Sequence, residues 1–267
     1  AIKNNYSKYT PVSGYEDLRE AIAKKFQRDN GLNYQKENIV VSTGAKQSII
    51  NVVMTIVNNG DEVIIPAPFW VSYIEMVKVI EGVPVIVSAD IESDFKISPA
   101  QLEAAITPKT KLMIFSSPCN PTGSVYNKEE LAEIADVLKR HPQIVAISDE
   151  IYEHINFVGQ HASIAEFEDI YDQTVVVNGV SKAYSMTGWR IGYAVGPSIL
   201  IKAMIKIQGQ STSNASSISQ YAALAGIGGS NDFLKPCLQA FDERRIYVFN
   251  RLNNIQCCYV IRFGRID

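Results

Sequence analysis

The chain alternates between short β-branched segments and longer amphipathic segments. Several of the short segments are unbroken apolar runs, which is typical of strands that are covered on both faces of a sheet. Strands that alternate with helices predict an α/β fold with a mostly parallel, seven-stranded sheet and helices on both of its faces. The predicted strands are Asn38–Ser42, Glu62–Ile65, Pro84–Ser88, Lys111–Ser116, Ile144–Ser148, Thr174–Asn178 and Ile191–Val195.

The longer segments carry the start and stop signals of helices. Leu18, Ile22 and Phe26 recur every four residues, which places them on one helix face. Ser98, followed by a proline and then Gln101, has the signature of a capping box at a helix start. The predicted helices are Tyr15–Asn30, Lys46–Asn59, a helix that begins at Ser98, a helix from Asn127 to about Arg140, Ser198–Gln208, Ser216–Ile227 and Asp232–Leu252.

The composition of the chain argues against several classes of function. The 267 residues include 25 Lys and Arg against 28 Asp and Glu, and this net charge of -3 argues against binding to nucleic acid. No apolar run approaches the roughly 20 residues that span a bilayer. The cysteines and histidines have neither metal-site nor disulfide-framework spacing. We therefore expect a cytoplasmic protein without a metal site, a membrane partner or a nucleic-acid partner.

Polar and small residues follow the predicted strands in four places. Ligands of open α/β sheets bind at the carboxyl ends of the strands, so residues placed there are candidates for chemistry. The four loops are Thr43–Lys46, Ser116–Gly123, Asp149–Tyr152 and Val180–Arg190.

Six motifs in and around these loops carry a family resemblance. They are Lys8-Tyr9-Thr10-Pro11 with Gly14, Thr43-Gly44-Ala45-Lys46-Gln47, Pro68-Phe69-Trp70-Val71-Ser72-Tyr73, Asn120-Pro121-Thr122-Gly123, Ser148-Asp149-Glu150-Ile151-Tyr152, and a stretch from Ser181-Lys182 to Gly188-Trp189-Arg190-Ile191-Gly192-Tyr193. In this order they resemble the class I and II aminotransferases, which are fold-type-I enzymes that use pyridoxal phosphate (PLP), and most of all the prokaryotic-type aspartate aminotransferases. The resemblance implies transfer of an amino group between an L-amino acid, aspartate or glutamate, and a 2-oxo acid by a ping-pong mechanism.

The resemblance implies roles for five of these residues. Lys182 would bind the cofactor aldehyde as an imine and move the substrate's α-proton. Asp149 would keep the pyridine nitrogen protonated, and Arg190 would bind the phosphate. Tyr152 and Asn120 would hydrogen-bond the phenolic oxygen of the cofactor, and Asn120 would also lie at the substrate. Taken alone, these positions also allow a solvated lysine, a helix-capping aspartate, a structural ion pair, a core tyrosine and a turn asparagine.

The remaining site residues concern the phosphate, the substrate and a second subunit. Gly44 and Ala45 lie between a strand and a helix N-terminus, which suits a phosphate. The resemblance associates Lys46 with the distal carboxylate of acidic substrates, while a phosphate contact or a solvated lysine stays open. Trp70 would stack on the cofactor ring and reach the substrate carboxylate, unless it is an interior tryptophan. Tyr9 would reach the phosphate of the neighbouring subunit in a homodimer with shared active sites.

Three features depart from the family pattern. Gly179 stands where many members have a phosphate-binding serine, and Ser181 is the candidate replacement. We expect residues 1–255 to be a PLP-binding large domain that lacks the family's N-terminal segment. We expect residues 256–267 to be an aberrant or truncated tail in place of the small C-terminal domain. That domain supplies the arginine that binds the substrate α-carboxylate, and Arg262 is not assigned this role, so we expect poor activity from the chain alone.

Other functions fit parts of the pattern. An aromatic or neutral amino-acid transaminase or a fold-type-I lyase would use the same cofactor residues, and Lys46 argues against both. A non-catalytic PLP-binding module, such as the ligand-sensing domain of a transcription regulator, would come with a basic segment that this chain does not show. An inert fragment is the third alternative.

Overall fold

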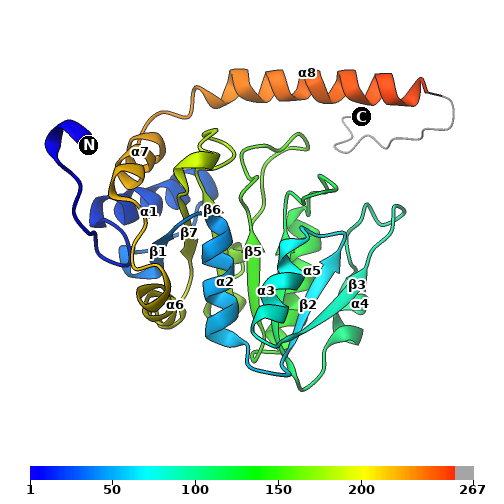
Figure 1. Cartoon of the computed structure of the whole chain (residues 1–267). Coiled ribbons are helices and arrows are strands. Elements are labelled where there is room, and N and C mark those ends of the chain that lie inside the picture. Colours follow the sequence, from blue (N-terminus) through cyan, green and yellow to red (C-terminus); the bar gives the residue numbers. More distant parts are fainter. Residues whose placement is uncertain (256–267) are drawn as a thin grey trace.

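The computed structural model describes residues 1–255, so the predictions for residues 256–267 and Arg262 lie outside the described residues. One sheet forms the centre, with the strand order β1-β7-β6-β5-β4-β2-β3 (Figure 1). Each predicted strand is present with its ends shifted by two residues at most. The strands are β1 (Ile39–Ser42), β2 (Glu62–Ala67), β3 (Val83–Ser88), β4 (Thr110–Ser116), β5 (Val145–Asp149), β6 (Thr174–Gly179) and β7 (Gly192–Val195).

Strand direction follows the predicted pattern with one exception. Neighbours from β6 to β3 pair in parallel, whereas β7 pairs antiparallel with both β6 and β1. The register sets Gly192, the first residue of β7, opposite both Ser42 at the end of β1 and Gly179 at the end of β6. The start of β7 therefore lies at the same edge of the sheet as the carboxyl ends of the other strands.

The helices begin and end close to the predicted positions. Ser98 accepts a hydrogen bond from the backbone N–H of Gln101, and Asn127 accepts one from that of Glu130, so the predicted capping boxes are present. The α-helices are α1 (Glu16–Asn30), α2 (Ala45–Ile56), α3 (Ser72–Val79), α4 (Pro99–Ala105), α5 (Lys128–Arg140), α6 (Ser198–Ser211), α7 (Ser217–Ile227) and α8 (Leu234–Asn253). The 3₁₀ helices are η1 (Ile2–Asn4), η2 (Lys36–Asn38), η3 (Ile164–Glu166), η4 (Glu168–Gln173) and η5 (Thr187–Trp189).

Three helix predictions need correction, and the first is the end of α6, which lies at Ser211, three residues beyond the predicted Gln208. Helix α2 ends at Ile56, three residues before the predicted end at Asn59, because Val57 has already turned to an extended conformation. Helix α3 was not predicted. It has only eight residues and follows a proline-rich segment, where a single short helix leaves little periodic signal.

Helices cover both faces of the sheet, as predicted. Val40 packs on one face with residues of α2, α3 and α6, and its neighbours Ile39 and Val41 pack on the opposite face with α1 and α7. Helices α4 and α5 cover that second face toward β3. Because successive side chains of a strand point to opposite faces, unbroken apolar runs are what a doubly covered sheet requires. In residues 1–255, no helix combines the length and the apolar character that crossing a membrane would need.

Candidate active site

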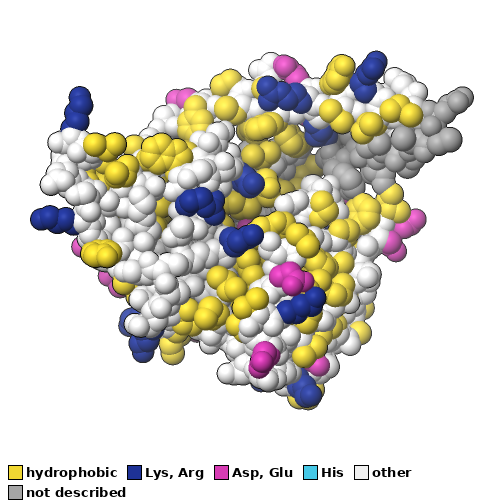
Figure 2. Space-filling view, viewed as in Figure 1, with side chains coloured by type: hydrophobic (Ala, Val, Ile, Leu, Met, Phe, Trp, Pro, Cys, Tyr) yellow, Lys and Arg dark blue, Asp and Glu magenta, His cyan; other side chains and the backbone are white. Residues whose placement is uncertain are grey.

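A pocket of about 230 Å³ opens at the carboxyl edge of the sheet. On the face that Figure 2 shows, Lys and Arg side chains gather between α2 and α8, near the loops that build this pocket. All of the predicted site residues line it except Gly44 and Tyr9. The lining residues are Ala45, Lys46, Trp70, Tyr73, Ser116, Asn120, Asp149, Ile151, Tyr152, Ser181, Lys182, Thr187 and Arg190.

Asp149 is the last residue of β5 and is buried at the floor of the pocket. Its Oδ2 atom accepts a hydrogen bond of 2.7 Å from the hydroxyl of Tyr73, and its Oδ1 atom accepts one of 3.3 Å from the backbone N–H of Ile151. Burial raises the pKa of Asp149 to about 6, although both hydrogen bonds favour the charged form. Within residues 1–255, no lysine or arginine forms an ion pair with this carboxylate. The site therefore offers a desolvated acid that a cationic ligand group would stabilise.

Tyr73 is a site residue that the sequence analysis did not assign. It lies in the first turn of α3, where its backbone N–H donates to the carbonyl of Trp70, and its ring meets the Trp70 ring edge-on at 5.6 Å. Burial, and then the charge of Asp149, raise the pKa of Tyr73 well above its usual range, so its hydroxyl remains a donor. The spacing of Trp70 and Tyr73 was the available signal, because residues three apart share one side of a helical turn.

Lys182 lies in the loop that follows β6, and its side chain lines the pocket. The Nζ atom lies 5.4 Å from the centre of the Tyr152 ring, which is within range of a cation–π contact. The positive charge of Lys182 also favours the ionised form of Asp149. The loops after β5 and β6 thus bring an amine, a phenol and a buried carboxylate to one cavity.

Close backbone packing joins Arg190 to the start of α2. Gly44 has a φ of 86°, and a Cβ atom there would lie 2.2 Å from Nη2 of Arg190. A Cβ atom on Gly192 would lie 2.1 Å from the backbone nitrogen of Ala45. Nη1 of Arg190 donates a 2.7 Å hydrogen bond to the carbonyl of Thr187, which orients the guanidinium. A guanidinium beside the free N–H groups of a helix N-terminus is a suitable cradle for an anion.

Lys46 and Trp70 form one wall of the pocket. The Nζ atom of Lys46 lies 4.7 Å from the centre of the Trp70 ring. The indole is partly buried against the core beneath α2 and α3. The wall is therefore apolar on the side of the core and carries the charge of Lys46 at the pocket. Both residues stand where a bound ligand can reach them, and their predicted roles stay predictions.

Gly179 has a physical reason for its departure from the family pattern. A Cβ atom there would lie 2.8 Å from the carbonyl oxygen of Ile191 and 2.9 Å from the Cα atom of Gly192. The tight approach of β6 and β7 therefore excludes a serine unless the backbone moves. Ser181, two residues later, is buried and lines the pocket, as does Asn120 from the loop after β4.

Tyr9 lies outside the pocket and is 91% exposed. It belongs to the N-terminal segment that precedes α1, and its predicted contact requires a second subunit. The role of Tyr9 stays a prediction.

Known proteins share this sequence and fold. Residues 1–264 match the profile of the family described as aminotransferase class I and II. The aspartate/prephenate aminotransferase of Cereibacter sphaeroides is 52% identical over 255 residues, which cover 95% of this chain and 64% of that protein. The crystal structure of the aspartate aminotransferase from Rhizobium meliloti superposes with a TM-score of 0.94 at 46% identity, covering 96% of this chain and 64% of that chain.

A protein of different printed specificity is also similar. The aromatic aminotransferase from Pyrococcus horikoshii superposes with a TM-score of 0.90 at 36% identity, covering 94% of this chain and 68% of that chain. The chain spans 64% of the length of the curated relatives from C. sphaeroides and Rhizobium leguminosarum. The predicted fold is confirmed, and the chain belongs to the class I and II aminotransferases.

Proposed function

We propose that this chain is the cofactor-binding part of a PLP-dependent enzyme that moves an amino group between an L-amino acid and a 2-oxo acid. The observation that carries the proposal is one pocket that holds the amine of Lys182 and the buried carboxylate of Asp149. Residues 1–255 would then be the PLP-binding large domain. The family membership of the chain supports the same reaction class.

The residues present fit PLP at both ends of the pocket. A protonated pyridine nitrogen is a cation that would stabilise the buried carboxylate of Asp149, and Arg190 with the N-terminus of α2 suits the phosphate. When bound, PLP supplies an electron-withdrawing ring that stabilises negative charge at the substrate Cα. Asp149 is held for this contact by Tyr73, whose hydroxyl stays protonated and keeps one carboxylate oxygen in place.

The other pocket residues bind the substrate, move its proton and exclude water. The Nζ atom of Lys182 would remove the proton from the substrate Cα and deliver it to the aldehyde-derived carbon of the cofactor in the same half-reaction, and the second half-reaction would run this transfer in reverse. The Trp70 ring closes one side of the pocket and keeps water from the reacting atoms. Tyr152 and Asn120 line the pocket as hydrogen-bonding groups for the cofactor oxygen.

Acidic amino acids are the proposed donors. The Nζ atom of Lys46 stands at the pocket wall, where it can pair with a distal carboxylate, and the R. meliloti relatives are aspartate aminotransferases. Aromatic amino acids are the second candidate, because the P. horikoshii structure is similar over 94% of the chain. A panel of aspartate, glutamate, phenylalanine and alanine, with 2-oxoglutarate and prephenate as acceptors, separates the two. Transfer from phenylalanine or alanine without transfer from aspartate or glutamate would contradict the acidic assignment.

A shared active site is part of the proposal. Tyr9 is almost fully exposed, as a side chain that reaches a neighbouring subunit would be in a single chain. A homodimer in the cytoplasm is the proposed state. Sedimentation with and without PLP measures the oligomeric state, and mixing Tyr9→Phe with Lys182→Ala subunits tests whether the sites are shared.

The attachment point is tested by absorbance. We expect a band between roughly 360 and 430 nm that stays with the protein after it is loaded with PLP and unbound PLP, which also absorbs in this range, is removed. Lys182→Ala should abolish this band, whereas Lys202→Ala, which alters an exposed lysine of α6, should leave it unchanged. A band that persists in Lys182→Ala would contradict the proposed attachment point.

A further inference from the structure

A buried ion pair anchors the turn that follows β5. Glu153, four residues after Asp149, pairs with Lys25 of α1, and their side chains are 4% and 1% exposed. Asn30 links the two, since it accepts a 2.9 Å hydrogen bond from Lys25 and donates a 3.0 Å hydrogen bond to Glu153. Burial would raise the pKa of Glu153, but the charge and hydrogen bond of Lys25, together with the neighbouring His154 and His161, outweigh it and lower the pKa to about 2. Glu153 is therefore ionised at neutral pH.

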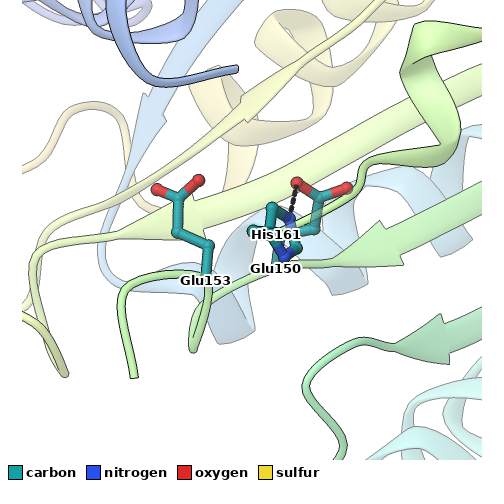
Figure 3. A group of neighbouring side chains, drawn as sticks. All are labelled: Glu150, Glu153 and His161. Atoms are coloured by element: carbon teal, nitrogen blue, oxygen red, sulfur yellow. Dashed lines mark hydrogen bonds and ion pairs between the residues drawn. The ribbon is translucent and has the colours of Figure 1, made fainter. Parts of the chain in front are cut away.

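A second buried carboxylate holds the start of the same turn. Oε1 of Glu150 accepts hydrogen bonds of 2.6 Å from Ser163 and 2.9 Å from Ser148, and its Oε2 lies 2.9 Å from Nε2 of His161 (Figure 3). Burial opposes the charged form of His161, but the charge and hydrogen bond of Glu150 raise its pKa above the usual value. The backbone N–H of Glu150 also donates to Val177 of β6, at 2.9 Å.

A metal ion is not needed to explain this cluster. One ligand atom each from Glu150, Glu153 and His161 lie within 4.8 Å of one another, a spacing that could hold a cation. Lys25 already neutralises Glu153, and His161 already pairs with Glu150. A divalent ion would have to compete with an ammonium group that is almost completely buried, and this would leave a buried charge without a partner.

The turn alternates between two sets of contacts. Asp149 and Tyr152 line the pocket, whereas Glu150 and Glu153 do not line it and contact other parts of the protein. Residues 150–153 are neither strand nor helix, and their backbone is held by the hydrogen bond from Glu150 N–H to Val177 and by local bonds such as Glu153 N–H to the carbonyl of Glu150. Apolar contacts are non-directional, whereas charge-assisted hydrogen bonds to two carboxylates fix both position and rotation.

We propose that Glu150 and Glu153, with Lys25 as the cationic partner of Glu153, are positioning residues that hold Asp149 and Tyr152 at the cofactor pocket. The proposal rests on the function proposed above. It extends the active site to α1, which contributes no residue to the pocket lining. Loss of the anchor should loosen the presentation of the Asp149 carboxylate and the Tyr152 ring while the sheet itself stays intact.

The test replaces both charges together, because a single replacement would leave the other charge buried and unpaired. Lys25→Met/Glu153→Met keeps the approximate volume of the pair, and folding is checked by circular dichroism and the thermal midpoint. We expect PLP to bind about tenfold to a hundredfold more weakly, as for misplaced binding groups, with a shifted pH midpoint of the PLP absorbance band. A double variant with wild-type PLP affinity and pH midpoint would overturn the proposal.

Two further variants keep the test decisive. Lys139→Met/Asp169→Met removes an exposed ion pair between α5 and η4 and should leave both readouts unchanged. Asn30→Ala keeps the buried ion pair but removes its bridging amide, so it should weaken PLP binding less than the double variant does. If the double variant does not fold, wild-type behaviour of Asn30→Ala overturns the proposal. A wild-type chain that gives no absorbance band with PLP refutes the proposed function instead, and the two failures are thereby distinguished.

Discussion

The two ends of the pocket hold their charged side chains by different means. Asp149 is buried, and its position depends on the hydrogen bonds from Tyr73 and Ile151. Arg190 is exposed, and its position depends on glycines that allow the backbone to approach it closely. The first end is controlled by desolvation and the second by steric fit. Perturbations of the two ends should therefore differ in size and in pH dependence.

The largest expected effect comes from the sterically controlled end. Gly192→Ala places a methyl group about where the backbone of Ala45 lies, so β7 or α2 must move. We expect the free energy of unfolding to fall by about 3 kcal/mol or more, measured by urea denaturation. Gly209→Ala is the control, because its Cβ would meet nothing closer than 3.8 Å on a helix. Equal stability of the two variants would show that the close approach is not a constraint.

The buried end should show the strongest pH dependence. The pKa of Asp149 is about 6 in the folded protein, above the usual aspartate value, so its ionisation costs stability above that pH and costs nothing below about pH 4. Asp149→Asn should therefore stabilise the PLP-free protein by about 2–3 kcal/mol at pH 8, and the gain should vanish as the pH falls to about 4. Thermal unfolding across this pH range measures the gain. A gain that does not depend on pH would contradict the desolvation argument, and Asp169→Asn, at an exposed site, should show none.

Removal of the hydrogen bond from Tyr73 tests how far that bond stabilises the charged form of Asp149 at the buried end. Tyr73→Phe deletes the hydrogen bond to Asp149, which favours the charged carboxylate. We expect a loss of about 1 kcal/mol in the free energy of unfolding and a pKa of Asp149 above its present value. Titration of the carboxyl group by NMR measures the second effect. Tyr126→Phe, which removes a different buried hydroxyl, should leave the pKa of Asp149 unchanged.

The smallest effect on stability should come from the exposed guanidinium. Arg190→Lys keeps the charge and loses the forked geometry, so the free energy of unfolding should change by less than about 0.5 kcal/mol. Affinity for PLP should nevertheless fall by about tenfold, because an ammonium cannot make two parallel hydrogen bonds to phosphate. Fluorescence titration with PLP measures this loss of affinity. Inorganic phosphate that competes with PLP should show the same loss of affinity for the variant. An unchanged affinity for PLP would show that Arg190 does not bind the phosphate.

Sequence patterns predicted the scaffold because local signals were strong. The strands are apolar runs bounded by polar residues. The helix caps predicted at Ser98 and Asn127 are present in the structure. The same patterns could not predict α3, which is too short to show a period, and with it the contact of Tyr73 with Asp149 was missed. Site positions were predictable from the strand ends, whereas their functional roles depend on a ligand and a second subunit.

Long-range contacts had no local signal at all. Asn30 and Glu153 are 123 residues apart in the sequence, and nothing in either segment indicates the other. A buried lysine such as Lys25 also looks like an ordinary polar position of an amphipathic helix until its partner is known. Gly179 was visible as an anomaly, but its cause, the close approach to Ile191 and Gly192, required the packed sheet.

The reversed direction of β7 has a consequence for how the chain can vary. Because Gly179 and Gly192 pair in adjacent strands, residues 180–191 form a loop whose two ends are held side by side. Lys182 lies near the first end of this loop and Arg190 near the second, so the sheet sets the spacing between the amine and the guanidinium. We therefore expect insertions in the middle of this loop to be tolerated, whereas a single residue added beside either end would displace one charged group relative to the other.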